Sequence, residues 1–596
     1  MSIRVESLGV MSRANQWTRW MTVVEPGTGR QLALGLPQHG GFVLVDPADR
    51  SCRIVGQEKT LPNAWAVTQA PDGTIYTAGV ASGGFAARIL QWDWKTPVST
   101  VAAETPQCAT LFTIAAAPDN RLYLPDYKTN TLHRFDPATR QVERLTDFKP
   151  FGEHIREIAC APDGLVYVTC TDYHRYVIVC YDPATGRSFL VADPEGTRIQ
   201  PRSPVTDSNG RVLVSQQYWG RSVWRELVGG KPVAVDPVAV ALNANNEPLA
   251  FRDGSYLVTG KERQVTLVDA NGLSTAFEVQ WPEEPCRIFS VAEGGGRIWG
   301  STFIPLTLFS YDPATGAGTP YGNPTATNGE IYSMAFSGGK LFLASYYGAF
   351  LSRFDPARPW NMDGTVRANP ANLGQMKAPP MSLQRPYGKA LDKAGRVFFS
   401  ALGGYGCTDS GLSRIEPESE EVTTWIFKDT TFGPIVYLPG RDQILVSELR
   451  KGEKKIHFTF LSPHTGEAVE SFPVIEDEGM VTSWLYEGGD LVYGLHNARA
   501  TLFAYSLAEK RIVARMPELA MGHHCYECLV AGPDGRLWGL TRECIFAVDR
   551  ALTTKERLLD YPDYADGNFY RFGMVRGADG CFYFPNGPQL MKVICQ

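Results

Sequence analysis

The sequence has no long apolar run. Its first forty residues contain no uninterrupted apolar segment of signal-peptide length, and no later stretch approaches the roughly 18 apolar residues that a membrane-spanning helix needs. Its twelve cysteines are scattered along the chain, which excludes the dense disulfide framework of a small secreted domain and predicts mostly reduced, buried thiols. We therefore expect a cytoplasmic location.

The sequence also lacks a strong excess of charge of either sign. Its 57 basic and 63 acidic residues give a net charge of −6, so the chain as a whole has no attraction for nucleic acid or for an anionic membrane. The Walker A, dinucleotide-binding, Cys-x-x-Cys-His haem and Gly-x-Ser-x-Gly motifs are absent. We expect neither a nucleic-acid nor a membrane partner, and no cofactor that depends on these motifs.

The sequence does contain a repeat. Each copy has a short apolar strand, a Pro-Asp-Gly or Gly-Gly turn and a second alternating strand; a third strand often ends in an Asp-Pro-Ala turn and is followed by a fourth. Asp-Gly and Gly-Gly supply the positive φ that a tight hairpin turn requires. The clearest copies lie at 66–80, 113–127, 157–171, 290–303, 333–347 and 528–542.

Four antiparallel strands recurring every 42–50 residues are typical of β-propeller blades. We place thirteen first strands, near residues 19, 65, 111, 155, 203, 245, 287, 331, 387, 433, 482, 525 and 571. Because single propellers usually have four to eight blades, the sequence predicts an all-β tandem, or double, β-propeller of about 13–14 four-stranded blades. The first propeller would cover 1–325 with about seven blades, and the second 326–596 with six or seven.

The end of the chain offers a different division. The unit that begins near residue 571 runs out after three strands, whereas residues 2–10 form an unassigned strand before the first blade. If residues 2–10 complete the last blade over 571–596, the closure removes an open sheet edge. One propeller would then be discontinuous, with the other inserted between its blades.

The repeated strands resemble those of a known superfamily. The "APDG" strands and "GPDGRLWGL" look like the Asp-Gly strands of the propellers that include virginiamycin B lyase, the gluconolactonases and the NHL repeats, over nearly the whole chain. The resemblance implies architecture. Members of this superfamily include lyases, lactonases, glycan-cleaving enzymes and scaffolds, mostly as single propellers, so it does not select a function.

In a propeller, the loops that enter the innermost strands and the loops between second and third strands emerge on one face, around the central channel. That face is the expected ligand site. The candidate catalytic residues on these loops are His523, His524, His154 and Tyr570. The candidate substrate-binding residues are Arg156, Arg571, Arg385, Arg287, Arg499, His496, His174, Tyr218 and Arg221.

The chemistry of these residue types points to an acidic ligand. Arginine forks suit bidentate capture of carboxylates, and a uronate lyase needs a His or Tyr base, a cation or metal that neutralises the carboxylate, and an acid for the departing oxygen. We predict a lyase-type enzyme acting on an acidic, uronate-containing saccharide or another carboxylated small molecule. A divalent ion held by Glu157 or Glu527 beside a histidine is an alternative to arginine; no cofactor is otherwise indicated.

Other interpretations stay open. The chain could instead be a non-catalytic scaffold for protein–protein interaction, a glycoside hydrolase or a lactonase. The segment 523–528, "HHCYEC", suggests zinc, but a structural zinc site needs four ligands and no second Cys-x-x-Cys pair follows. Aromatic residues such as those in "SYYGAF" either stack on sugar rings or pack between blades.

Overall fold

The computed structural model describes most of the chain. The described residues are 3–37, 41–56, 64–79, 87–108, 110–171, 176–191, 204–206, 210–218, 221–235, 249–260, 263–281, 283–361, 368–378, 381–404, 407–477, 479–497, 500–517, 519, 525–561 and 573–595, with backbone alone at 64, 215–218, 221–223, 377–378 and 381–382. They form two compact units: unit 1 comprises Met1–Ala14 and Pro285–Gln596, and unit 2 comprises Asn15–Glu284. No helix within these described residues is long and apolar enough to cross a membrane.

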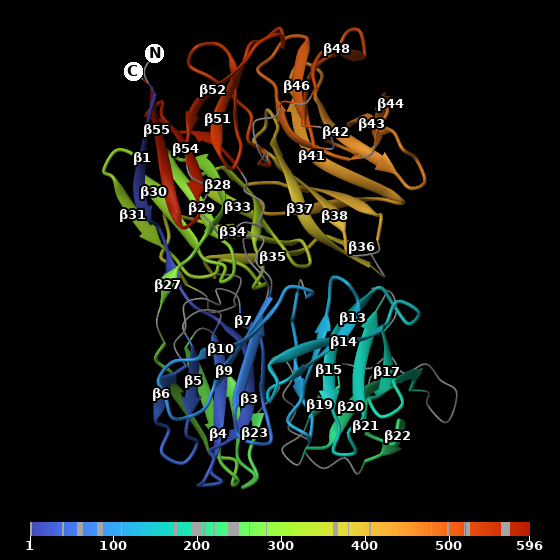
Figure 1. Ribbon diagram of the computed structural model, residues 1–596. Coiled ribbons are helices and arrows are strands. Elements are labelled where there is room, and N and C mark those ends of the chain that lie inside the picture. The colour runs from blue at the N-terminus through green and yellow to red at the C-terminus, as the bar shows by residue number, and fades with distance from the viewer. Residues whose placement is uncertain are drawn as a thin grey trace. The chain divides into compact units, whose positions relative to one another are not determined.

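Within its described residues, unit 2 contains six four-stranded antiparallel sheets, drawn from blue to green in Figure 1. Their first strands are β3 (Trp17–Val24), β7 (Ala64–Gln69), β11 (Ala115–Ala116), β15 (His154–Cys160), β19 (Val205–Thr206) and β23 (Leu249–Ala250). Contacts link β3 to β7, β7 to β11, β11 to β15 and β15 to β19, and β23 returns to β3. The first strands therefore form a ring, as in a propeller.

The part of unit 1 that the structure describes contains seven blade sheets. Their first strands are β28 (Ile288–Gly294), β32 (Ile331–Ser337), β37 (Met381–Leu391), β41 (Thr430–Leu438), β45 (Val481–Leu485), β49 (Val530–Ala531) and β53 (Val575–Arg576). The sheet of β37 gains a fifth strand, β36 (Lys377–Ala378), at its inner edge. Two further short strands, β2 (Arg13–Ala14) and β27 (Glu284–Pro285), pair where the chain leaves and re-enters unit 1.

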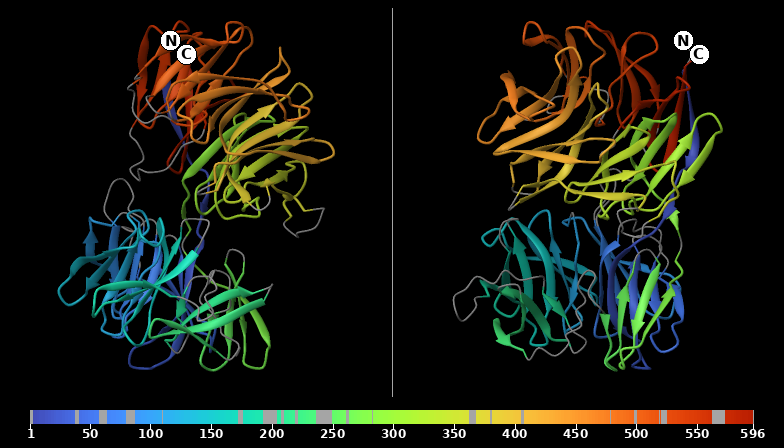
Figure 2. Two further views of the ribbon diagram at one scale, coloured as in Figure 1. Left: turned by 90° about the vertical axis from the view of Figure 1, so that its right-hand side faces the viewer. Right: turned by 180° about the vertical axis from the view of Figure 1, so that it is seen from behind.

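The N-terminal strand closes unit 1. β1 (Ile3–Val10) pairs antiparallel with β55 (Gln589–Cys595) in the sheet of β53, with Val5 opposite Val593. Both ends of the chain lie together in every view (Figures 1 and 2). The prediction of a double propeller of about 13–14 blades, closed by the N-terminal strand, is confirmed.

The observed boundaries differ from a division at 325/326. Contacts divide the chain after Ala14 and after Glu284, so the units have six and seven blades. The reason is the pairing of β1 with β55, which draws residues 285–325 into the same ring as the C-terminal blades: β28 contacts both β32 and β54 (Phe582–Asn586). Local repeats in the sequence give the number of blades, but they do not show to which propeller each blade belongs.

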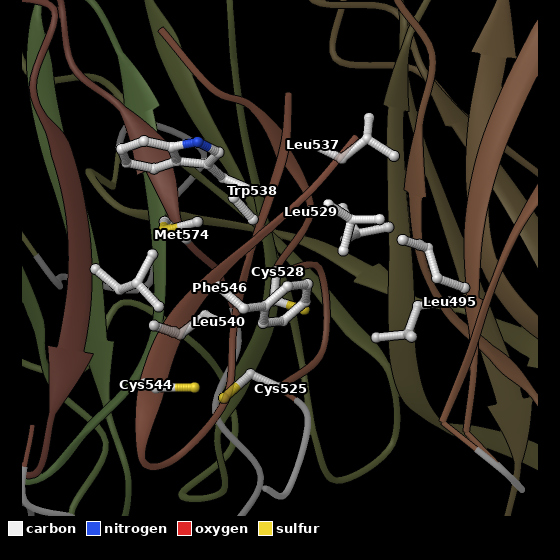
Figure 3. Close-up of a cluster of buried hydrophobic side chains, with 14 of the residues drawn as sticks. Leu495, Cys525, Cys528, Leu529, Leu537, Trp538, Leu540, Cys544, Phe546 and Met574 are labelled. Carbon is white, nitrogen blue, oxygen red and sulfur yellow. The ribbon is translucent and has the colours of Figure 1, made fainter. Parts of the chain in front are cut away.

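The core of each unit lies between neighbouring blades. One cluster in unit 1 joins the sheets of β45, β49 and β53, and Figure 3 shows Leu495, Trp538, Phe546 and Met574 within it. The side chains alternate along each strand, so both faces of a blade contribute to such clusters. This packing between blades holds the inner strands around the channel.

Candidate functional site

A β-bulge near the start of the inner strands sets the direction of the side chains at the entry face. The register skips one residue between Ile155 and Glu157, between Ile288 and Ser290 and between Ile331 and Ser333. The skipped residues are Arg156, Phe289 and Tyr332. Bulges redirect side chains and are frequent next to functional sites. These three residues are therefore candidates for contact with a ligand.

The entry face of unit 1 carries a buried carboxyl group. We call its described residues mouth 1: Glu330, Tyr332, Tyr346, Tyr347, Arg385 and Tyr387. Glu330 directly precedes β32 and is 5% exposed, and its Oε2 has no hydrogen-bond partner among the described residues. Burial raises the pKa of Glu330 to about 8, and the Arg385 guanidinium opposes that rise. The group is therefore mostly protonated at neutral pH.

Arg385 and the tyrosines surround this carboxyl group. The Arg385 guanidinium lies 4.9 Å from the ring centroid of Tyr346 and is a hydrogen-bond partner of Tyr332. Burial, with a further contribution from Glu330, raises the pKa of Tyr332 well above its usual value. Tyr347 neighbours Tyr346 at 6.0 Å between ring centroids and is 58% exposed. Mouth 1 thus combines an exposed aromatic ring with a buried acid and an arginine.

Side chains from non-neighbouring blades of unit 1 meet across the ring. The rings of Tyr387 and Tyr526 stack at 5.3 Å, and Lys389 forms an ion pair with Glu527. Tyr387 and Lys389 belong to β37 in the third blade, whereas residues 526 and 527 enter the sixth of seven blades. These contacts therefore cross the channel between the third and the sixth blade.

The entry face of unit 2 contains an aromatic series. We call its residues mouth 2: Arg19, Trp65, Phe112, Tyr127, His154, Arg156 and Glu157. The His154 ring stacks on Tyr127 at 4.6 Å, and its Nδ1 lies 3.1 Å from the carbonyl oxygen of Tyr127, so Nδ1–H donates. Arg156 lies over the same ring at 5.1 Å. His154 is therefore held in place by Tyr127.

The predicted metal ligands Glu157 and Glu527 each face a cation, Arg19 and Lys389 respectively. Within the described part of the chain, no group of three or more His, Cys, Asp or Glu side chains is placed to hold a metal ion. None of the twelve cysteines forms a disulfide in the described structure, and most are buried. Cys525 and Cys528 belong to the apolar cluster of Figure 3, so the two cysteines of "HHCYEC" pack into the core at a blade entrance.

The structure brings some of the predicted site residues to the entry faces and leaves others apart. Arg385 joins mouth 1, and His154, Arg156 and Glu157 join mouth 2. Arg287 immediately precedes β28 and is half-buried. His496, at the end of β46 (Leu491–His496), is only 3% exposed and so offers a ligand little surface.

Several predictions fall outside the described residues: His523, His524, Tyr570, Arg571, Arg499 and His174. Tyr218 and Arg221 end β20 (Val212–Tyr218) and begin β21 (Arg221–Val228), but their side chains are not described. These assignments stay predictions.

The sequence analysis missed Glu330 and both cross-channel pairs. Glu330 occupies the same register as His154 and Arg287, one residue before the bulge partner Ile, so a complete alignment of the repeats would have found it. Arg19 and Glu157 are 138 residues apart, as are Lys389 and Glu527. This separation in the sequence equals three repeats of 46 residues. Each pair therefore joins blades on opposite sides of a ring.

No protein-family model and no curated protein matches this sequence. Solved structures similar to the chain include the extracellular domain of the hybrid two-component system BT3049 from B. thetaiotaomicron, with 12% identity, 96% of this chain and 74% of that chain covered and a TM-score of 0.35. Another is the extracellular domain of the one-component system BT4673 from the same organism, with 12% identity, coverage of 100% and 82% and a TM-score of 0.33. At these values the likeness transfers no ligand or activity to this chain.

The comparisons contradict the expectation of a cytoplasmic location, because these similar chains are extracellular domains. That expectation rested on the missing signal-peptide run and on scattered cysteines. Neither feature specifies a compartment for a domain of this size, so the assignment is not retained.

Proposed function

We propose that mouth 1 binds a carboxylated saccharide. The observation that carries this proposal is the Oε2 of Glu330, which is buried without a hydrogen-bond partner among the described residues beside Arg385. A buried polar atom left unsatisfied costs free energy that a hydrogen-bonding ligand recovers. A saccharide hydroxyl is a suitable partner because it both donates and accepts.

The charge of mouth 1 favours an acidic ligand. Since Glu330 is mostly protonated at neutral pH, it does not cancel the charge of Arg385. A guanidinium in a partly desolvated site binds a carboxylate through paired hydrogen bonds. Tyr347, which is 58% exposed, offers a ring face on which a sugar ring can stack.

We propose recognition rather than elimination. A lyase base must lose its proton readily, and the raised pKa of Tyr332 keeps the phenol protonated. The described histidine among the predicted bases, His154, lies in unit 2 and is held by Tyr127. The described residues of mouth 1 thus supply hydrogen bonds, a cation and a stacking surface.

The test is isothermal titration calorimetry with oligogalacturonates and with neutral galactose oligomers of equal length. We expect tighter binding of the acidic series, a loss of about tenfold or more on Arg385→Gln, and weaker binding of both series on Tyr347→Ala. Arg358→Gln is the matched control, because Arg358 is exposed in the turn after β34 (Phe350–Phe354), at the other end of the blade.

Equal affinity for both series, or full binding by Arg385→Gln, would contradict the proposal. Appearance of the ultraviolet absorbance of an unsaturated uronate during incubation would show elimination and would overturn recognition as the whole function.

A further inference from the structure

Arg19 places a guanidinium in the middle of the unit 2 channel. It lies on β3, in the first of six blades, yet its Nη2 is 3.3 Å from a carboxylate oxygen of Glu157 on β15, in the fourth blade. The same Nη2 lies 3.4 Å from the carbonyl oxygen of Phe112, just before β11 in the third blade. In a six-bladed ring the first and fourth blades are opposite, so this side chain crosses the channel.

The ion pair does not use all the hydrogen-bond donors of Arg19. Glu157 contacts only Nη2, and the buried Nε of Arg19 has no hydrogen-bond partner among the described residues. An arginine binds a carboxylate best through two parallel N–H donors. Both side chains of the pair are 23% exposed, so the pair is partly accessible to solvent.

The walls above this pair are aromatic. Phe112 contacts Trp65 at 5.9 Å and 85° and Tyr127 at 5.1 Å and 68°, both nearly edge to face. Such an edge-to-face series is extended naturally by another flat ring. Arg156, over Tyr127, adds a second positive charge, so Arg19, Arg156 and Glu157 together leave mouth 2 with one net positive charge.

We infer that mouth 2 is a second ligand site, which binds a small planar aromatic carboxylate, and that Glu157 occupies the position that the ligand carboxylate takes on Arg19. The ligand ring extends the series of Trp65 and Phe112, and its carboxylate receives hydrogen bonds from Nε and Nη2 of Arg19. Glu157 then acts as an internal competitor. This inference concerns unit 2 and does not depend on the function of mouth 1.

The test is calorimetric titration of the whole chain, carrying Arg385→Gln to weaken mouth 1, with benzoate, benzamide and glucuronate as probes. We expect benzoate to bind and the uncharged benzamide to bind at least about tenfold more weakly. Removing the competitor by Glu157→Gln should tighten benzoate binding about tenfold, whereas Arg19→Gln should abolish it.

The direction in which Glu157→Gln changes the affinity for benzoate distinguishes ligand exchange from a structural role. If the ion pair of Arg19 and Glu157 only stabilises the fold, both substitutions will lower the midpoint of thermal unfolding and neither will tighten the binding of benzoate. Benzoate binding that Glu157→Gln leaves unchanged or weakens would overturn the inference. Glucuronate binding tighter than benzoate would overturn the ligand class. If Arg19→Gln does not fold, the comparison of Glu157→Gln with its parent still decides.

Discussion

At the scale of single residues, the buried carboxyl of Glu330 links stability to pH. Its pKa is raised to about 8 by burial, whereas an unfolded glutamate titrates near 4.5. Between these values the folded state holds a proton that the unfolded state has released. The stability that this proton provides is complete below about pH 4.5 and is lost as pH rises through about 8.

We therefore expect Glu330→Gln to flatten the pH profile of stability. Between pH 5 and pH 8 the free energy of unfolding of unit 1 in the parent should fall relative to the variant by about 2–4 kcal/mol. Urea denaturation at a series of pH values measures the difference. Parallel profiles would mean that Glu330 ionises in the fold without cost.

At the scale of strands, three blades of unit 1 repeat one contact between a glycine and a phenylalanine. Gly300 lies opposite Phe309, Gly494 opposite Phe503 and Gly539 opposite Phe546, on the second and third strands of their blades. In each pair the ring covers the glycine so closely that a Cβ atom would overlap it. Only glycine fits at these three positions, because any larger residue would overlap the phenylalanine ring.

Gly539→Ala should accordingly destabilise unit 1 by about 1–3 kcal/mol through overpacking against Phe546. The control is Gly440→Ala, because no atom lies within 4 Å of a Cβ placed at Gly440. Thermal unfolding followed by near-ultraviolet circular dichroism compares them. Equal midpoints for the two variants would show that the Phe546 ring moves aside without cost.

At the scale of the whole molecule, ring closure decides which segments fold together. β23 returns to β3 within residues 15–284, so unit 2 closes without help from the rest of the chain. In unit 1, β28 needs β32 on one side and β54 on the other. A fragment ending at 325 therefore contains one blade with both neighbours missing.

Residues 15–284 expressed alone should form a β-rich monomer with one cooperative thermal transition. Residues 1–325 should contain the same transition and an exposed apolar blade, which favours aggregation. Size-exclusion chromatography and circular dichroism distinguish the two fragments. A fragment 15–284 that fails to fold, while 1–325 folds as a monomer, would contradict the division seen in the structure.

The blades and their approximate number could be predicted from the amino-acid sequence alone. The turn residues and the alternation of apolar and polar residues are local properties. They can be recognised in segments such as 157–171 and 528–542 without knowledge of the strands that pair with them. The register that placed His154 and Arg156 at an entry face is local in the same way. It also led to the alternative in which residues 2–10 supply the missing fourth strand of the last blade.

Which side chains meet depends on the closed rings. Arg19 reaches Glu157, and Lys389 reaches Glu527, because the number of blades in each ring sets which strands face each other across the channel. Burial likewise changed Glu330 from an ordinary acidic residue into a protonated one. Channel width and burial arise from the closed ring, and no local segment of the sequence contains them.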